Sequence, residues 1–204
     1  MKYKLYMFDF DLTMADTLDA SAMSYADAYA TLGLKFDKRE TVRHLGIPVE
    51  VTFDEITDGV KNDGRYQKFL DAFYLSLKES FHTVTLYPDV LAAFERIKNG
   101  GAYVAVVTNR TKPTMRTVYD KYPGLEKVVA TTVTGDDVER RKPFPDPLIT
   151  CMQRLGVSPD QTIYFGDAKN DFLSANAAGV KFIYVDRTGY VNEADAIKSF
   201  DEIE

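Results

Sequence analysis

The sequence has little of several features that mark whole classes of protein. Only Cys151 among the 204 residues is a cysteine, and none is a tryptophan. A lone cysteine cannot form a disulfide within the chain, which fits a reducing compartment. The apolar runs are all shorter than the roughly 18 residues that a membrane-spanning helix needs. No signal-like apolar segment follows residues 1–4. We therefore expect a soluble, cytoplasmic protein, with Cys151 serving in packing.

Positive charge is also scarce. The chain has 25 lysine and arginine residues against 31 aspartate and glutamate residues, a formal net charge of -6. A general nucleic-acid-binding or anionic-membrane-binding surface needs a basic excess, so neither partner is expected. An anionic substrate would have to be bound by a few local cations and a metal ion. Hydrophobic residues make up 45% of the chain, enough for one sizeable core.

Short apolar runs alternate with helical patterns along most of the chain. The runs lack a clean alternation of apolar and polar residues, as expected when both faces of a sheet are covered. Helical patterns lie between them, including one that ends at Gly100 and one over residues 169–178 that ends at Gly179. The order of strand and helix predicts an α/β fold with a doubly wound parallel sheet. The expected strands are residues 5–8, 102–107, 128–133, 162–165 and 182–185.

One segment, residues 16–83, interrupts this order and contains helical patterns without a convincing strand. Two apolar stripes step by three and four residues, which is typical of helices packed on one face. The first stripe is Leu18, Ala22, Tyr25, Tyr29 and Leu32, and the second is Tyr66, Phe69, Leu70, Phe73, Leu77 and Phe81. We expect a Rossmann-like catalytic core of residues 1–15 and 84–204, with residues 16–83 inserted as a small helical cap.

Carboxylates follow the first and the fourth expected strands. Asp9 and Asp11 are two residues apart at the end of the first strand, so they start on the same side. Asp167 and Asp171 are four residues apart and would share a helix face. Any one of them could be only a turn or cap residue. Ligands of open parallel sheets bind at the carboxyl ends of the strands, and a site rich in carboxylate oxygen suits Mg²⁺.

Polar and basic residues follow the other strands. Residues 108–110, Thr-Asn-Arg, end the second expected strand and could hold phosphate oxygens or simply form a turn. A run of three cations, residues 140–142, precedes Pro143 and could be a solvated basic loop. Lys142 stands next to the rigid proline and is the best placed of the three to act as a fixed charge.

Together these four clusters resemble the motifs of the haloacid dehalogenase superfamily over nearly the whole chain. Residues 9–13, Asp-Phe-Asp-Leu-Thr, look like its first motif and Thr108-Asn109 its second. Lys142-Pro143 looks like the third motif, and residues 166–180 look like the fourth. The insert is similar to the cap of the subgroup that includes phosphoglycolate phosphatases and β-phosphoglucomutase. Residues 44–48, His-Leu-Gly-Ile-Pro, resemble a cap loop of the phosphatases.

The chain departs from the family pattern at Leu12, where the family often has glycine. Dehalogenases of the family lack the second aspartate, whereas this chain has Asp11, which favours phosphate chemistry. The resemblance implies that Asp9 is the nucleophile and that Asp11 transfers protons. It also implies Mg²⁺ held by the Asp9 carboxylate, the Asp11 backbone carbonyl and Asp167, with Asp171 in support. The residues that would hold phosphoryl oxygens are Thr108, Asn109 and Lys142.

Three basic residues are candidates for contact with the rest of the substrate: Arg43, His44 and Arg110. Two other functions stay open. A phosphomutase would need a cap residue that steers a sugar hydroxyl, yet the only histidines, His44 and His82, do not closely follow the first motif. A phosphate-sensing module would be shorter and would lack the cap. We therefore expect a Mg²⁺-dependent phosphatase for a small phosphorylated metabolite, acting as a monomer or homodimer.

Overall fold

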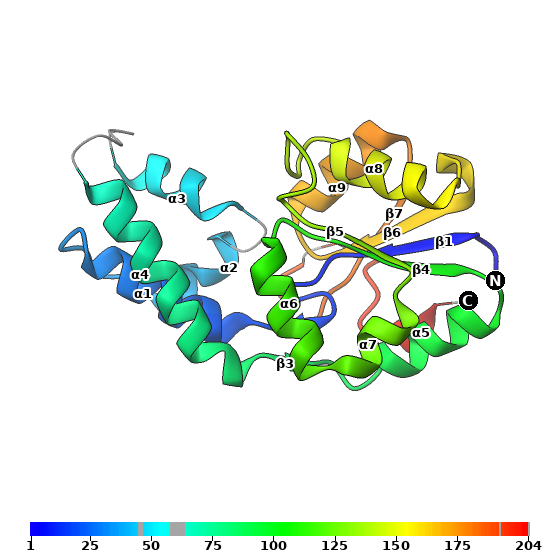
Figure 1. Ribbon diagram of the computed structural model, residues 1–204, viewed down its shortest axis with the longest axis horizontal. Helices are drawn as coiled ribbons and strands as arrows, with labels where there is room; N and C mark the ends of the chain where they lie inside the picture. Colours follow the sequence, from blue (N-terminus) through cyan, green and yellow to red (C-terminus); the bar gives the residue numbers. More distant parts are fainter. Residues whose placement is uncertain (45–46, 58–63, 192, 204) are drawn as a thin grey trace. The chain divides into compact units, whose positions relative to one another are not determined.

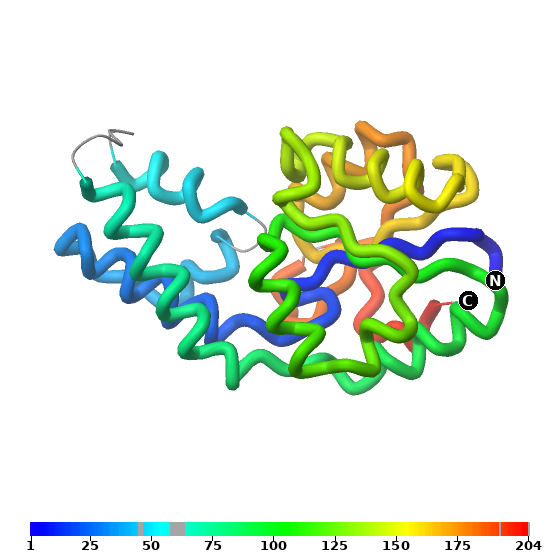
Figure 2. Tube along the Cα trace, in the orientation of Figure 1, coloured from blue at the N-terminus to red at the C-terminus, as the bar shows by residue number. Residues whose placement is uncertain are grey.

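The computed structural model describes residues 1–44, 47–57, 64–191 and 193–203. The chain divides into two compact units. Unit 1 consists of Met1–Met14 and Leu86–Glu204, and unit 2 consists of Ala15–Thr85. In Figure 2, which is coloured along the sequence, unit 1 consists of the first residues, in dark blue, and the green-to-red remainder of the chain.

Unit 1 contains a five-stranded sheet in which all neighbouring strands run parallel. Its strand order is β5-β4-β1-β6-β7, so β1 lies in the middle. The chain therefore winds outward from β1 in one direction and then in the other, which confirms the predicted doubly wound α/β sheet. The strands are β1 (Leu5–Phe8), β4 (Tyr103–Val107), β5 (Thr131–Val133), β6 (Thr162–Gly166) and β7 (Lys181–Tyr184).

Helices cover both faces of this sheet (Figure 1). One face carries α5 (Val90–Asn99), α6 (Lys112–Lys121) and α7 (Pro123–Val128), and the other carries α8 (Asp146–Leu155) and α9 (Lys169–Ala178). Short 3-10 helices η3 (Pro159–Gln161) and η4 (Phe200–Glu202) complete the unit. All four residues of β1 are buried, because two helical layers remove both of its faces from water.

Each face of β1 packs into its own apolar layer. Leu5 and Met7 belong to a cluster that includes Cys151 from α8, so the lone cysteine is a buried packing residue. On the other face, the Phe8 ring lies 4.6 Å from the Phe94 ring and 4.9 Å from the Phe200 ring, measured between centroids. This packing fixes the strand whose end carries Asp9.

The expected strand over residues 128–133 is wrong in its first half. Residues Pro123–Val128 form α7, and only Thr131–Val133 form β5. A proline at the first helical position is well suited to start a helix, and Leu125 is fully buried. A helix of six residues is too short for its period to be recognised. The sequence pattern therefore places its last residue, Val128, in the strand.

Unit 2 is helical, apart from a two-residue strand at its start and the first residue of another at its end. Its elements are α1 (Leu18–Ala30), η1 (Lys38–Glu40), α2 (Thr41–His44), α3 (Val49–Ile56), α4 (Arg65–Glu79) and η2 (Ser80–Thr83). Helices α1 and α4 pack side by side. The short strands β2 (Ala15–Asp16) and β3 (Thr85–Leu86) pair where the chain passes between the units. Sequence reasoning missed this pairing, since two residues carry no period.

Aromatic side chains form the interior of unit 2. The Tyr25 ring lies 4.9 Å from the Phe73 ring and 5.5 Å from the Phe36 ring. Tyr25 and Phe73 come from the two predicted apolar stripes, which face each other across α1 and α4. In the part of the chain that the structure describes, no helix is both long and apolar enough to cross a membrane.

Candidate active site

The carboxyl ends of the three central strands bring Asp9, Thr108 and Asp167 to one edge of the sheet. Backbone hydrogen bonds continue the sheet past the strand ends. The Asp9 N–H donates to the Phe165 carbonyl and the Thr108 N–H donates to the Val133 carbonyl, both at 2.9 Å. Asp9 is 2% exposed and Thr108 is 1% exposed. Residues that are far apart in sequence therefore meet in a buried site.

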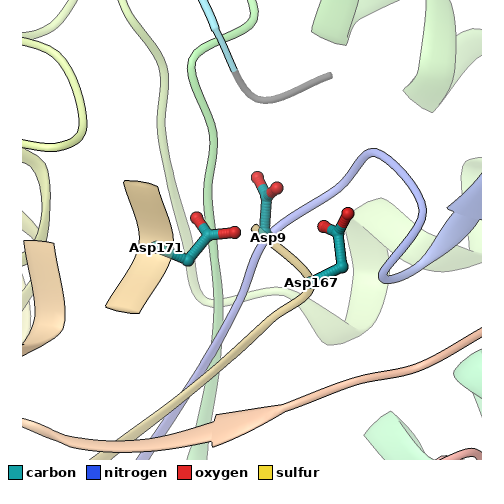
Figure 3. Close-up of side chains that lie close together, drawn as sticks. All are labelled: Asp9, Asp167 and Asp171. Carbon is teal, nitrogen blue, oxygen red and sulfur yellow. The ribbon is translucent and has the colours of Figure 1, made fainter. Parts of the chain in front are cut away.

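Three carboxylates gather at this edge (Figure 3). One oxygen from each of Asp9, Asp167 and Asp171 lies within 4.8 Å of the other two. Asp9 follows β1 and lies between Asp171, from the first turn of α9, and Asp167, which follows β6. Three carboxylates this close repel one another unless cations offset their charge.

The Lys142 ammonium is the buried cation that meets two of these carboxylates. Its Nζ lies 2.7 Å from Asp9 Oδ1 and 2.6 Å from Asp171 Oδ1. The lysine is 1% exposed, whereas the other two cations of its run are partly or largely exposed and pair elsewhere. Of the three cations in this run, Lys142 is therefore the one whose side chain is held in a buried position.

The Asn109 side chain forms two hydrogen bonds with the backbone of Lys142. Its Oδ1 accepts from the Lys142 N–H at 3.0 Å, and its Nδ2 donates to the Lys142 carbonyl at 3.1 Å. The Thr108 hydroxyl accepts from the Arg110 N–H at 3.2 Å. The side chain of Asn109 thus positions the lysine, a contact that the expectation for its backbone N–H did not include.

A glycine lets Asp171 approach the site. The Asp171 Oδ2 accepts from the Ala168 N–H at 3.1 Å, in the first turn of α9. A Cβ atom at Gly166 would lie 2.6 Å from the Asp171 carboxyl group, far inside van der Waals contact. The glycine of the fourth motif is therefore required by the close packing of Asp171 against the end of β6.

Burial and mutual repulsion shift the acidities in this cluster. Burial, together with the charge of Asp171, raises the pKa of Asp9 to about 7 although Lys142 opposes the shift. Burial also raises the pKa of Asp167 well above its ordinary value, with further contributions from Asp171 and Asp9. Burial alone would lower the pKa of Lys142, but the charges of Asp171 and Asp9 outweigh it and raise that pKa. The raised pKa values of Asp9 and Asp167 therefore indicate that the site has too little nearby positive charge to keep both carboxyl groups readily ionised.

The turn after β1 places Thr13 against Asp167. The Met14 N–H donates to the Phe10 carbonyl at 3.0 Å, and Leu12 has a φ of 50°. This left-handed conformation costs a non-glycine residue about 1–2 kcal/mol, and Leu12 offsets it with a side chain that is 2% exposed. The buried Thr13 hydroxyl donates to Asp167 Oδ1 at 3.0 Å.

Arg110 binds Asp11 at the same edge. Its Nε donates to Asp11 Oδ2 at 2.9 Å and its Nη2 donates to Asp11 Oδ1 at 2.7 Å. Two parallel charge-assisted hydrogen bonds fix both the position and the plane of the carboxylate. The guanidinium also lies over the Phe10 ring, 4.9 Å from its centroid. Its Nη1 is buried and makes no hydrogen bond to any residue that the structure describes.

Arg43 and His44 lie in unit 2, in α2. Arg43 is exposed and pairs with Glu40 at 2.8 Å. The His44 ring is half-buried and lies 4.9 Å from the Tyr25 ring, and burial lowers its pKa. The resemblance over residues 44–48 includes residues 45 and 46, which lie outside the described residues. The structure thus brings the core candidates together, and these two cap candidates belong to the other unit.

Two further side chains reach the cluster without being expected there. The sequence pattern predicts only that Thr13 belongs to the first motif and that Tyr164 lies in a strand. The Tyr164 hydroxyl lies 2.9 Å from Lys142 Nζ and donates to Asp171 Oδ1 at 2.7 Å. No sequence signal separates Tyr164 from Tyr6, which also lies in the middle of a fully buried strand.

Comparison with known proteins places the chain in a family. The family model described as haloacid dehalogenase-like hydrolase matches residues 6–185. The pyrophosphatase PpaX of Oceanobacillus iheyensis is 28% identical over 200 residues, which cover 98% of this chain and 90% of that protein. A phosphoglycolate phosphatase of Haemophilus influenzae is 29% identical over 187 residues, covering 87% of this chain and 83% of that protein.

Solved structures share the fold. The crystal structure of a predicted phosphoglycolate phosphatase from Haemophilus somnus superposes with a TM-score of 0.87 at 21% identity, covering 100% of this chain and 97% of that one. The matched family model includes the segments that hold Asp9, Lys142 and Asp171. The chain therefore belongs to the haloacid dehalogenase-like hydrolase family.

Proposed function

We propose that the protein is a Mg²⁺-dependent phosphatase that hydrolyses a small phosphorylated metabolite through an aspartyl phosphate on Asp9. The observation that carries this proposal is the buried contact between Asp9 and Lys142, 2.7 Å at the carboxyl end of the central strand. A carboxylate is a poor nucleophile toward a phosphate dianion unless nearby cations offset the repulsion. The pair supplies both the nucleophile and a cation.

In the first step, one Asp9 oxygen attacks phosphorus while the bond between phosphorus and the ester oxygen breaks. Asp11 gives a proton to the departing oxygen, which leaves as an alcohol from an ester or as a phosphate from an anhydride. In the second step, water attacks the phosphorus of the aspartyl phosphate and Asp11 takes a proton from it. Inorganic phosphate leaves and the Asp9 carboxylate is restored.

Lys142 and Thr108 are the side chains proposed to hold the transferred group. The Lys142 ammonium lies beside the attacking carboxylate, where charge on the phosphoryl oxygens would otherwise be repelled. The Thr108 hydroxyl accepts from the Arg110 N–H, which leaves its own proton to be donated to a phosphoryl oxygen. The backbone N–H of Asn109 is a further donor candidate.

The donor set fits Mg²⁺, which prefers oxygen ligands and is commonly bound by one or two carboxylates. Asp9 and Asp167 would hold the ion, with the Asp11 backbone carbonyl as a third ligand. Asp171 Oδ1 already accepts hydrogen bonds from Lys142 and Tyr164. Asp171 is therefore proposed to support the lysine and not to bind the ion directly. When bound, Mg²⁺ neutralises charge on the transferred phosphoryl group.

The substrate is proposed to be small and to carry its phosphate on an ester or anhydride oxygen, as the names of the pyrophosphatase and phosphoglycolate phosphatase relatives suggest. Arg110 is the core candidate for contact with the rest of the substrate, because its buried Nη1 could donate to a substrate oxygen. Unit 2 is proposed to act as a cap, and Arg43 and His44 are its candidate contacts.

The test compares Asp9→Asn with Asp160→Asn, a matched change at an exposed aspartate in η3. With Mg²⁺ and a panel of phosphorylated metabolites, Asp9→Asn should lower phosphate release by more than about a hundredfold, since an amide is a far weaker nucleophile. Asp160→Asn should leave the rate unchanged. A folded Asp9→Asn protein with wild-type turnover would contradict the proposal. Release of inorganic phosphate also separates a phosphatase from a phosphomutase or a phosphate sensor.

A further inference from the structure

A tyrosine hydroxyl lies inside the charged cluster beneath Asp9. Tyr164 is in β6, and its side chain is fully buried between the sheet and the layer of α8 and α9. Its ring lies 5.8 Å from the Phe182 ring. Packing would be served equally by phenylalanine, which has the same ring. The hydroxyl therefore needs a separate explanation.

The hydroxyl group completes a set of short contacts around the lysine. Four oxygens surround the Lys142 ammonium within 3.2 Å, and they belong to Asp9, Asp171, Tyr164 and Val107. An ammonium group has three N–H donors, one fewer than these acceptors. The tyrosine O–H is the fourth proton. It lies 2.7 Å from Asp171 Oδ1 and 3.2 Å from the Val107 carbonyl, and the shorter, charge-assisted hydrogen bond to the carboxylate is the stronger of the two.

The tyrosine proton occupies part of the hydrogen-bonding capacity of Asp171, so the carboxylate attracts the Lys142 ammonium less strongly. Asp171 Oδ1 accepts from both Lys142 and Tyr164, while Asp171 Oδ2 accepts from the Ala168 N–H. Without the hydroxyl, the Lys142 ammonium would be the one remaining hydrogen-bond donor to Asp171 Oδ1 among the side chains that the structure describes. A buried carboxylate that loses a donor draws the remaining donor closer. The ammonium would then move toward Asp171 and away from Asp9.

We propose that Tyr164 is a positioning residue that keeps the Lys142 ammonium at Asp9 by donating a hydrogen bond to Asp171. The inference rests on the proposed function, in which the same ammonium also meets the transferred phosphoryl group. Tyr164 contacts neither the substrate nor the reacting atoms. It acts only through the lysine and its second carboxylate.

The first test compares Tyr164→Phe with Tyr6→Phe, a matched loss of a hydroxyl from a buried tyrosine in the neighbouring strand β1. Because the Tyr164 ring is kept, both variants should fold, which a thermal unfolding curve checks. Tyr164→Phe should raise the inhibition constant for inorganic phosphate and lower kcat/KM for p-nitrophenyl phosphate, each by about tenfold, the size expected for a hydrogen bond to a charged group. Tyr6→Phe should leave both constants within about twofold, since it makes no contact with the lysine.

Two further measurements separate positioning from a general loss of structure. Calorimetric titration with Mg²⁺ alone should show no weaker binding for Tyr164→Phe than for wild type, because Asp9 and Asp167 are not altered and the ammonium lies farther from Asp9, whereas a general loss of structure would weaken it. In an Asp171→Asn background the pull on the ammonium is gone, so adding Tyr164→Phe should change the phosphate inhibition constant by less than about twofold. Such non-additivity is expected of residues that act through one another.

Two results would overturn the inference. One is a Tyr164→Phe protein with the same phosphate inhibition constant as Tyr6→Phe. The other is a tenfold loss that persists in the Asp171→Asn background, which would mean that the hydroxyl acts by another route. A wild-type protein that neither turns over nor binds phosphate with Mg²⁺ present would overturn the proposed function itself, and this inference with it.

Discussion

Among the ion pairs that the structure describes, unit 1 has buried as well as exposed pairs, whereas those of unit 2 are exposed. In unit 1, the Lys142–Asp9 pair joins side chains that are 1% and 3% exposed and lie 133 residues apart in sequence. In unit 2, the Lys38–Asp19 pair joins side chains that are 66% and 64% exposed. Water and salt screen the second pair but hardly reach the first.

Buried ion pairs hold their charges at fixed positions, whereas the charges of exposed pairs can change partners. A buried pair persists only if its members satisfy each other, so removing one leaves the other uncompensated. An exposed pair contributes little to stability, and its members can turn to a ligand at small cost. Chemistry at a fixed geometry suits the buried set around Asp9. Recognition of variable substrate groups suits exposed residues such as Arg43.

Replacing the buried lysine should give the largest effect. Lys142→Met should lower the free energy of unfolding by about 3–5 kcal/mol, because it leaves Asp9 and Asp171 buried without their cation. The matched control is Arg140→Met, which removes an exposed partner of Asp146 in the same loop and should cost less than about 1 kcal/mol. Urea unfolding followed by circular dichroism measures both. Equal losses would remove the contrast between buried and exposed pairs.

Asp11→Asn should come next and should appear in the rate. Loss of a positioned proton donor and acceptor typically costs about 10²–10⁴-fold. The loss should be smaller for an aryl phosphate than for an alkyl phosphate, since a good leaving group needs less protonation. Steady-state kinetics on both substrates measures the difference. The same factor for both would count against Asp11 as the acid.

The metal site is tested by Asp167→Asn and Asp171→Asn compared with each other. Loss of a residue that only supports a ligand costs about 10–100-fold in metal affinity, so loss of the proposed ligand Asp167 should weaken Mg²⁺ binding at least as much. Asp171→Asn should weaken it less. Calorimetry measures both affinities, and a chelator should stop turnover. A larger loss of affinity for Asp171→Asn would indicate that the ion is bound between Asp9 and Asp171. Full activity in excess chelator would show that turnover does not need the metal.

The exposed pairs of unit 2 should give the smallest effect on stability. Arg43→Ala should change the free energy of unfolding by no more than about 0.5 kcal/mol. It should raise KM for the preferred metabolite while hydrolysis of a small aryl phosphate stays unchanged, because only the metabolite reaches the proposed cap contact. Lys38→Ala, at another exposed pair, serves as the control. An unchanged substrate profile for Arg43→Ala would place specificity elsewhere.

The positions of the core residues could be predicted because a strand end fixes them. Asp9 and Asp167 follow strands whose apolar runs are plain in the sequence, and parallel strands bring their carboxyl ends to one edge. Lys142 could be singled out by the proline after it. The helix Pro123–Val128 could not, since six residues do not establish a period.

The partners of these residues could not be predicted, because they depend on side chains that meet only after folding. Tyr164 looks like any aromatic residue of a buried strand, and its hydroxyl reaches Lys142 across 22 residues of sequence. The Thr13 hydroxyl reaches Asp167 across 154 residues. The pairing of Arg110 with Asp11 spans 99 residues. Local patterns give the end of a strand but not what stands opposite it.

The account depends most on a covalent bond between Asp9 and phosphorus. The direct measurement is an acid quench of the wild type and Asp11→Asn during turnover with Mg²⁺, followed by mass spectrometry of the peptide that contains Asp9. The account predicts a phosphoryl group on Asp9, retained for longer in Asp11→Asn because its second step lacks a base. Turnover with no phosphoryl group on that peptide in either protein, or with the group on another residue, would contradict it.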